Sequence, residues 1–336
     1  MIPSENAELA VPKRQLIGFG RRQIVTLVVL FFLGDWLGAG IAIYFVVASK
    51  HGQILQGEIF SGWVWWLVVL TVLVVLWYGR GVRRLAGGRG GVSAANQVFV
   101  YLGIFTAFAA VAPPIDTLAR DLYFVHQVQH MLLHMVAPLL LALGVPLAPL
   151  IAGLPDPLRR RLLKPLVRNR ALRRVWRVLV HPLGASLLFV FALYFWQIPH
   201  FMDLIALNDS FDEFAHVTML ISGLFFWWML LDPRAIPNAV SYPTRLAAVT
   251  LTMFACILGD AYIALTHREL YPVYARLSLA WGVSPHLDQT LGGLITWIDG
   301  SMTEVIAGLI VFHRWVQDES LRPLSRRRRA ARLRTA

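Results

Sequence analysis

The sequence predicts an all-α fold: a polytopic integral membrane bundle of about eight transmembrane helices. Of its 336 residues, 57% are hydrophobic and 15% are charged, whereas a soluble domain has about 25% charged residues. The mean hydropathy is +0.60. Apolar runs of spanning length lie near 22–48, 60–79, 97–113, 123–152, 180–199, 213–231, 246–266 and 290–313.

The first run, 22–48, is longer than the apolar core of a secretory signal and has no obvious small-residue cleavage site. We therefore expect a first transmembrane helix there. The chain divides into an N-terminal cytoplasmic segment with this additional helix (1–55), the main membrane domain (56–315) and a basic cytoplasmic tail (316–336).

Basic residues are spread unevenly over the connections between these runs. The two termini and every second connection hold 27 of the 31 lysines and arginines; the others hold Lys50, Arg120, Arg268 and Arg276. Because cytoplasmic loops are enriched in basic residues, both termini are predicted to be cytoplasmic. This topology also accounts for the net charge of +12. We therefore expect the basic residues to contact anionic membrane lipids and not nucleic acid.

Three histidines open the fourth run, which enters from the outer face. His126, His130 and His134 stand four residues apart. Four residues of an α-helix turn through about 400° and rise about 6 Å, so we expect a ladder on one face. His216, at the outer end of the 213–231 helix, should lie at the same depth. Ionisable groups in a membrane are costly unless they pair, bind a ligand or face water.

These residues favour a metal site. Imidazole is a good ligand for Cu, Zn, Fe and Ni, and thioether sulfur prefers Cu(I). Met131 and His134 are auxiliary candidates beside the three main histidines. The alternatives are histidines that hydrogen-bond between helices or carry protons, and a methionine that fills the core. The single cysteine, Cys256, excludes a CxxC motif and an intramolecular disulfide.

Carboxylates near the outer surface have two interpretations. Asp116 precedes the histidine helix, and Asp212 and Glu213 begin the 213–231 helix. They can gather cations or orient the histidines, or they can cap helix N-termini. For Asp299 and Glu304, deeper in the last run, the sequence identifies no partner.

Enzyme motifs are missing from the sequence. It has no Gly-rich phosphate loop, no GxSxG and no HExxH, and Gln127 stands where a zinc protease would carry its general base. We therefore expect no catalytic residues and no enzymatic activity.

Four blocks, in this order, resemble the CtaG-type cytochrome c oxidase assembly proteins, the multi-span family and not the single-span copper chaperone of the same name. They are HQVQHMLL (126–133) with APLLLALGVP (137–146), His216 leading into SGLFFWW (222–228), YPVY (271–274) and DQTLGGLITW (288–297). The resemblance covers about 60–315. His134 departs from the pattern, which leads us to expect an apolar residue or methionine there.

The resemblance implies a seven-helix core, preceded here by an additional helix, in a bacterial inner (plasma) membrane. It implies maturation of haem-copper oxidase through copper supply on the extracytoplasmic side. Partners would be cytochrome c oxidase subunits and extracytoplasmic copper chaperones. The motif positions are His126, His130, His216 and Asp288, the last in an orienting or cation-gathering role.

We therefore predict an outward-facing site between the fourth and sixth helices that holds copper as Cu(I) and passes it on by ligand exchange. Two alternatives stay open: a membrane redox protein with haem held by two histidines, and a metal-free oxidase assembly scaffold. A transporter is disfavoured because the chain has no evident inverted repeat. A homo-oligomer is compatible with the sequence.

Overall fold

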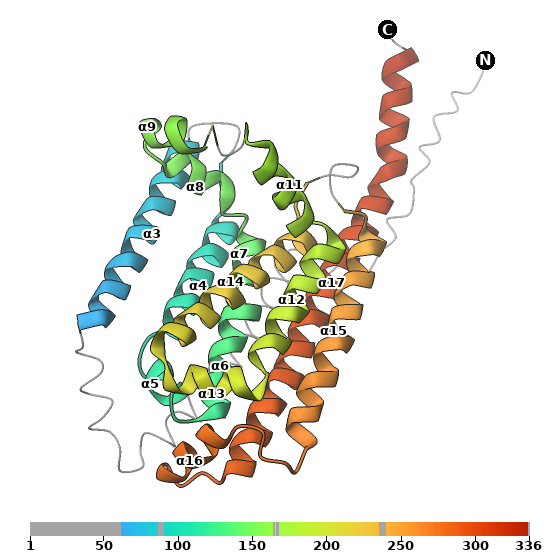
Figure 1. Cartoon of the computed structure of the whole chain (residues 1–336). Coiled ribbons are helices and arrows are strands. Elements are labelled where there is room, and N and C mark those ends of the chain that lie inside the picture. The colour runs from blue at the N-terminus through green and yellow to red at the C-terminus, as the bar shows by residue number, and fades with distance from the viewer. Residues whose placement is uncertain (1–61, 87–90, 164, 166–167, 235–239, 335–336) are drawn as a thin grey trace, which may run out of the picture.

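The computed structural model describes residues 62–86, 91–163, 165, 168–234 and 240–334 (Figure 1). Every regular element in these ranges is a helix, which confirms the all-α class. The helix predicted at 22–48, and with it the segment 1–55, lies outside the described residues.

The elements follow one another along the chain as α3 (Gly62–Ala86), α4 (Ala94–Ala110), α5 (Ile115–Ala119), α6 (Tyr123–Met131), the π-helical turn η1 (Leu132–Val136), α7 (Ala137–Gly144), α8 (Leu147–Gly153), α9 (Asp156–Leu158), a second π turn η2 (Arg159–Leu163), α11 (Arg170–Leu179), α12 (Pro182–Trp196), α13 (Pro199–Leu207), α14 (Asp209–Leu231), α15 (Tyr242–Leu265), α16 (Pro272–Ala280) and α17 (Pro285–Arg334).

The seven predicted runs within the described ranges each coincide with a helix: α3, α4, α6 to α7, α12, α14, α15 and α17. Five of these are long and apolar enough to cross a membrane. Helices α11 and α12 meet the criterion together, with a bend of 71° between them, and α4 is shorter, at 17 residues. The chain is therefore a polytopic membrane bundle, while the total of eight spans stays a prediction.

The histidine-bearing helix is the centre of the bundle. Helices α6, η1 and α7 run on as one helix, Tyr123–Gly144, with α4, α14 and α17 around it (Figure 1). Of its most apolar stretch, 83% is buried, against 11% for the peripheral α3. A helix buried on all sides is shielded from lipid, so its polar residues face protein.

The central helix ends earlier than its apolar run at 123–152 predicts. Val145 has left-handed backbone angles, φ 52° and ψ 58°, and Pro146 cannot continue the preceding helix. The chain turns back as α8, which packs on α3. There the indole N–H of Trp77 donates to the carbonyl of Leu150 at 2.9 Å.

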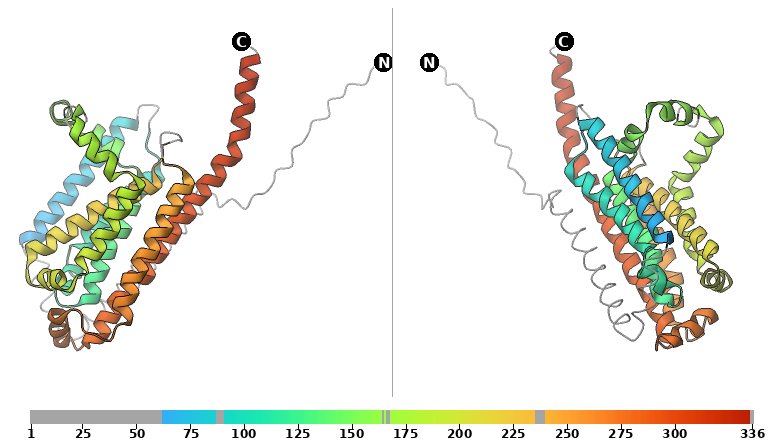
Figure 2. Two further views of the ribbon diagram at one scale, coloured as in Figure 1. Left: turned by 45° about the vertical axis from the view of Figure 1, so that its right-hand side comes forward. Right: turned by 90° about the vertical axis from the view of Figure 1, so that its left-hand side faces the viewer.

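The last helix extends far beyond its predicted run of 290–313. Helix α17 has 50 residues because a helix continues wherever its backbone hydrogen bonds do, whereas hydropathy marks only the apolar part. The predicted boundary at 316 falls inside this helix. Figure 2 shows α15 alongside α17 and the C-terminal part of α17 projecting from the bundle.

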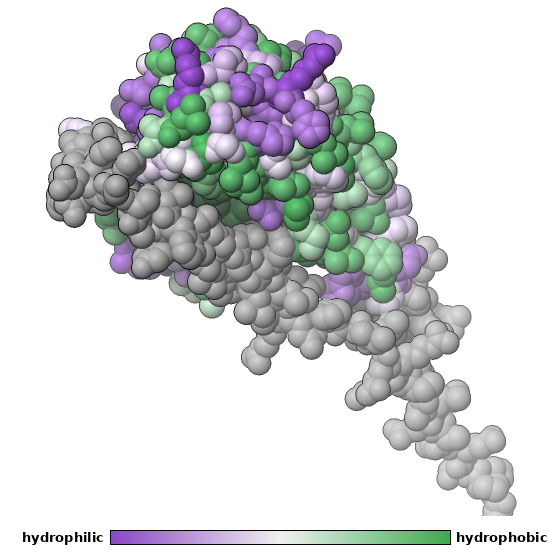
Figure 3. Space-filling view, turned by 90° about the horizontal axis from the view of Figure 1, so that it is seen from below, coloured by the Kyte–Doolittle hydropathy of each residue, from purple (hydrophilic) through white to green (hydrophobic). Residues whose placement is uncertain are grey.

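Short helices close one end of the bundle. Helices α5, α13 and α16 lie there, while α8, α9, α11 and the C-terminal part of α17 lie at the opposite end (Figure 1). Seen from the first end, hydrophilic side chains gather over the bundle and hydrophobic ones flank them (Figure 3). This pattern is typical of a membrane protein whose end leaves the bilayer.

Candidate metal centre

Three histidine side chains meet inside the bundle. One ligand nitrogen from each of His126, His130 and His216 lies within 4.8 Å of the others. The ring centroids are 4.3 Å apart for His126 and His130, and His216 lies 5.7 Å from both. All three side chains are buried. Helices α6 and α14 therefore bring together the histidines that were expected at a common depth.

The start of α6 is set by an acidic residue of α17. The Asp288 carboxylate accepts the backbone N–H of Tyr123 at 3.0 Å and that of Phe124 at 2.9 Å. The first N–H groups of a helix have no partner within it, and a negative charge there is favourable. Asp288 was predicted to orient the histidines or gather cations. In the structure its carboxylate holds the backbone of the helix that carries His126 and His130.

Close approach of the neighbouring helices depends on two glycines of the family-like blocks. A Cβ at Gly223 of α14 would lie 2.4 Å from the carbonyl oxygen of His134. A Cβ at Gly292 of α17 would lie 2.4 Å from the Tyr123 ring. Neither contact is sterically allowed, so any larger residue would push α14 or α17 away from the central helix.

Two glutamines of α6, Gln127 and Gln129, fix the orientation of this helix about its own axis. The amide oxygen of Gln127 accepts a hydrogen bond from Gln197 Nε2 at 2.7 Å, and Gln197 Oε1 accepts the Tyr123 hydroxyl at 3.0 Å. On another side, Gln129 Nε2 donates to Asp116 Oδ1 at 3.2 Å. These buried bonds keep the histidine face of α6 turned toward α14.

The acidic residue closest to the histidines is Asp212, which the sequence offered together with Glu213. Asp212 Oδ1 lies 3.2 Å from His216 Nε2, one turn along α14, and both atoms lack a partner with hydrogen-bond geometry. Glu213, which was predicted to act here, is exposed. Both spacings to His216, i, i+4 for Asp212 and i, i+3 for Glu213, place a carboxylate beside the histidine on a helix, so the sequence alone does not distinguish the two.

Asp116 belongs to an ion-pair network at the same end. Its carboxylate lies 3.1 Å from Arg120, whose guanidinium also lies 3.5 Å from Asp209. Burial raises the pKa of Asp116, and Arg120 opposes that rise. Asp116 therefore supports the histidine helix through Gln129 and has its negative charge partly compensated by arginine.

His134 does not join the other three histidines. It lies in η1, where the N–H of Ala137 donates to Leu132, five residues back. A π turn holds more residues than an α turn. The His134 side chain, four residues after His130, therefore does not complete the rotation about the helix axis that would align it with His126 and His130. The His134 ring stacks on Phe189 of α12 with centroids 4.0 Å apart. The predicted three-rung ladder is thus interrupted after His130.

Met131 lies beside a different space. It lines a small cavity together with His130, His134, Met135, Leu193, Asp260 and Thr296. On α17, Glu304 is buried and both of its carboxylate oxygens lack a hydrogen-bond partner within the described part of the chain. Asp299 is half-buried.

The histidine nitrogens fit a metal ion. His126 Nε2, His216 Nε2 and both nitrogens of His130 are buried and make no hydrogen bond to the described residues. An unsatisfied buried polar atom costs about 1–3 kcal/mol, and such atoms are rare in folded proteins. Three imidazoles suit Cu, Zn, Fe or Ni. Since a metal-nitrogen bond is about 2 Å, the rings would need to draw slightly together.

Comparison with known proteins places these residues in a family context. The sequence profile described as the cytochrome c oxidase caa3 assembly factor family (Caa3_CtaG) matches residues 76–318, a range that includes every residue of the histidine site.

Three curated mycobacterial proteins, all called uncharacterized, are similar to parts of the chain. Those of Mycobacterium bovis and Mycobacterium tuberculosis are 29% identical over 197 residues, which is 56% of this chain and 29% of each relative. That of Mycobacterium leprae is 25% identical over 223 residues, 64% of this chain and 33% of the relative. The chain thus spans about a third or less of these proteins. No solved structure matches.

Proposed function

Because the chain belongs to the cytochrome c oxidase caa3 assembly factor family, we propose that it supplies copper to the maturing oxidase from a site formed by His126, His130 and His216. One observation carries this proposal. The three side chains are buried in contact with one another, and four of their ring nitrogens have no hydrogen-bond partner among the described residues. Each neutral ring has one nitrogen without a proton, and a metal ion binds one such nitrogen from each of the three rings at once.

The position of the site supports release on the extracytoplasmic side. Tyr123 and Asp209, where α6 and α14 begin, lie at the end closed by α5, α13 and α16 (Figure 1). The opposite end carries the arginine-rich helix α11 and the C-terminal part of α17. Cytoplasmic segments are the basic ones, so the histidine end is the outer one. Asp212 and Asp116 add negative charge that attracts a cation there.

The proposed cargo is Cu(I), and no covalent bond is made or broken. Neutral imidazole binds Cu(I) well, and a buried site with few donors suits its low charge and low coordination number. His216 arrives from a different helix than the other two. Its side chain can therefore leave first while His126 and His130 still hold the ion, which permits transfer to a partner by ligand exchange. The partners in this scheme are oxidase subunits and extracytoplasmic copper chaperones.

A haem centre fits this geometry less well. Two axial histidines must leave room between their rings for a macrocycle. The ring centroids of the three histidines are separated by 5.7 Å at most. The site therefore favours a single ion over haem.

The test compares bound copper in three purified proteins: the native chain, the His126→Ala/His130→Ala variant, and a His267→Ala/His286→Ala control. The control removes another neighbouring pair, exposed at the same end, with ring centroids 5.4 Å apart. The native and control proteins should each bind about one copper ion per chain more than the His126→Ala/His130→Ala variant, and that variant should fail to mature the oxidase in cells.

Three results would overturn this proposal. Copper content unchanged in the His126→Ala/His130→Ala variant would remove the site. A Soret absorbance in the native protein would point to haem, whereas absence of copper from all three proteins, with normal oxidase maturation, would point to a metal-free scaffold.

A further inference from the structure

A second cavity lies deeper in the bundle than the three-histidine site. Its walls come from the central helix and from α12, α15 and α17: His130, Met131, His134, Met135, Leu193, Asp260 and Thr296. The volume of this cavity is about 10 Å³. A site of this size holds one water or one ion.

The rings of the two histidines of this cavity lack hydrogen-bond partners among the described residues. Both ring nitrogens of His134, like both of His130, are buried without a hydrogen bond to the described residues. The Asp260 side chain is also buried. Imidazole that merely bridged two helices would use at least one nitrogen to do so. Its orphaned nitrogens therefore indicate a ligand in the cavity.

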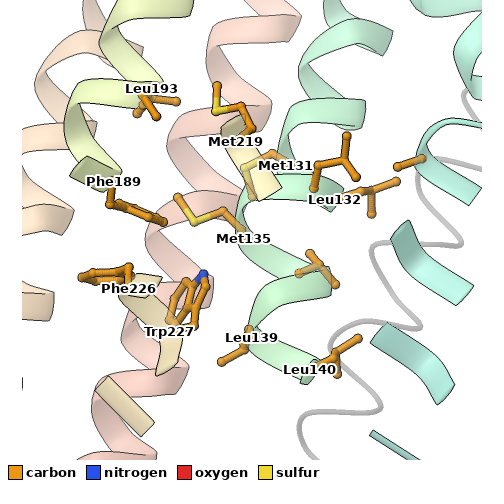
Figure 4. Packing of buried hydrophobic residues seen from close by; sticks show 14 of the residues in the cluster. Met131, Leu132, Met135, Leu139, Leu140, Phe189, Leu193, Met219, Phe226 and Trp227 are labelled. Atoms are coloured by element: carbon orange, nitrogen blue, oxygen red, sulfur yellow. The ribbon is translucent and has the colours of Figure 1, made fainter. Parts of the chain in front are cut away.

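Two thioethers give the cavity a soft character that the outer site lacks. Met131 and Met135 both reach across to Gly300 of α17, where a Cβ would lie 3.8 Å from Met131 Sδ and 3.6 Å from Met135 Cε. Figure 4 shows the two methionines on the central helix, facing the side of α12 that carries Phe189 and Leu193. Thioether sulfur combined with imidazole nitrogen selects Cu(I) among biological metal ions.

We propose that this cavity is a second Cu(I) site, with His134 and the sulfurs of Met131 and Met135 as ligands, which exchanges its ion with the outer site through His130. The inference rests on the proposed function and extends it. His130 borders both places and has two free ring nitrogens. A neutral imidazole binds a metal ion only through the ring nitrogen that carries no proton. The ion therefore moves between the sites by changing ligands one at a time, while the His130 ring loses its proton at one nitrogen and regains a proton at the other, without any change in oxidation state.

Asp260 connects the inner cavity with a larger one. It lines, together with Leu193, a cavity of about 300 Å³ between α12 and α15 that extends to Gln197 and Tyr271. A carboxylate in the shared wall is favourably placed for a cation that passes from one cavity to the other. Asp260 thus acts as a positioning residue of the second site.

The experiment separates the two sites by their donor atoms. The His126→Ala/His216→Ala variant removes the outer site but leaves His130, and it is loaded with Cu(I) under reducing conditions. X-ray absorption should then show bound copper with sulfur among its ligands. Adding Met131→Leu and Met135→Leu, which keep side-chain volume nearly constant, should abolish that copper. Met202→Leu, at another fully buried methionine, is the matched control and should retain it.

The outcomes distinguish this inference from the proposed function. Loss of all copper from the His126→Ala/His216→Ala variant, while the native chain still binds it, would overturn the second site and leave the outer one standing. Copper with nitrogen ligands alone in that variant would do the same. A native chain that binds no copper would overturn both.

If the combined variant fails to fold, the methionine pair is replaced in the otherwise native chain. Loaded with excess Cu(I), native protein should show nitrogen and sulfur ligands, and the Met131→Leu/Met135→Leu protein should show nitrogen alone. Sulfur absent from both, or present in both, contradicts the proposal.

Discussion

The Asp288 carboxylate accepts a hydrogen bond from the backbone N–H of Tyr123, a residue 165 positions earlier in the chain. This contact places the first turn of the last helix against the first turn of the central helix. It explains why two sequence blocks so far apart, one opening with His126 and the other with Asp288, form one structural unit. The depth of the histidine site is set by where α6 begins, and Asp288 fixes that point.

Replacement of Asp288 by alanine should therefore destabilise the protein without removing a metal ligand. Loss of a capping side chain costs about 1–2 kcal/mol. We expect a lower midpoint of thermal unfolding in detergent, with copper retained by the folded fraction. Asp203→Ala is the control, because the Asp203 carboxylate caps only the short helix α16, through Val273 N at 3.2 Å. An unchanged midpoint for Asp288→Ala would contradict the capping role.

Asp212 and Glu213 should differ sharply although they are neighbours. Asp212→Asn replaces by an amide the carboxyl group whose Oδ1 lies 3.2 Å from His216 Nε2. Loss of such an outer partner lowers metal affinity about 10–100-fold. Glu213→Gln, at an exposed position, should leave the affinity unchanged. Competition titrations with a Cu(I) chelator measure both variants, and equal affinities would show that Asp212 does not support the site.

The contact between α14 and the central helix can be tested through glycine. Gly223→Ala would place a methyl group 2.4 Å from the His134 carbonyl oxygen, and overpacking of this kind costs about 1–3 kcal/mol. We expect a less stable protein that binds copper weakly, because His216 is displaced from His126 and His130. In Gly308→Ala the nearest atom would be 3.7 Å away, so that variant should behave like the native protein. Equal stability of the two variants would be inconsistent with the packing described here.

Much of this architecture can be predicted from the sequence because segments that span a bilayer have a high mean hydropathy. His126 and His130 share a face because α6 is a regular α-helix at that point. His216 could be placed at the same depth from topology alone, since both helices were predicted to enter from one side. That its ring lies beside theirs comes only from the structure.

Other features depend on tertiary contacts or on local departures from regular geometry. The π turn that carries His134 toward Phe189 has no signature in the apolar pattern. The same departure separates His134 from the outer site, whereas Met131 precedes the π turn and lines the inner cavity from α6. The sequence offered Asp212 and Glu213 together, because residues three and four positions before His216 both lie near it on a helix; only the packing of α14 decides which of them turns inward.

The central claim is that two helices supply the ligands of one copper ion, and the Cu(I) affinity of His216→Ala tests it most directly. The substitution removes only the ligand from α14 and leaves the pair on α6. Our account predicts that the Cu(I) affinity of His216→Ala is at least about 10-fold below that of the native protein, because one nitrogen ligand is lost. The affinity of the His267→Ala control should equal that of the native protein. Native affinity in His216→Ala would contradict it.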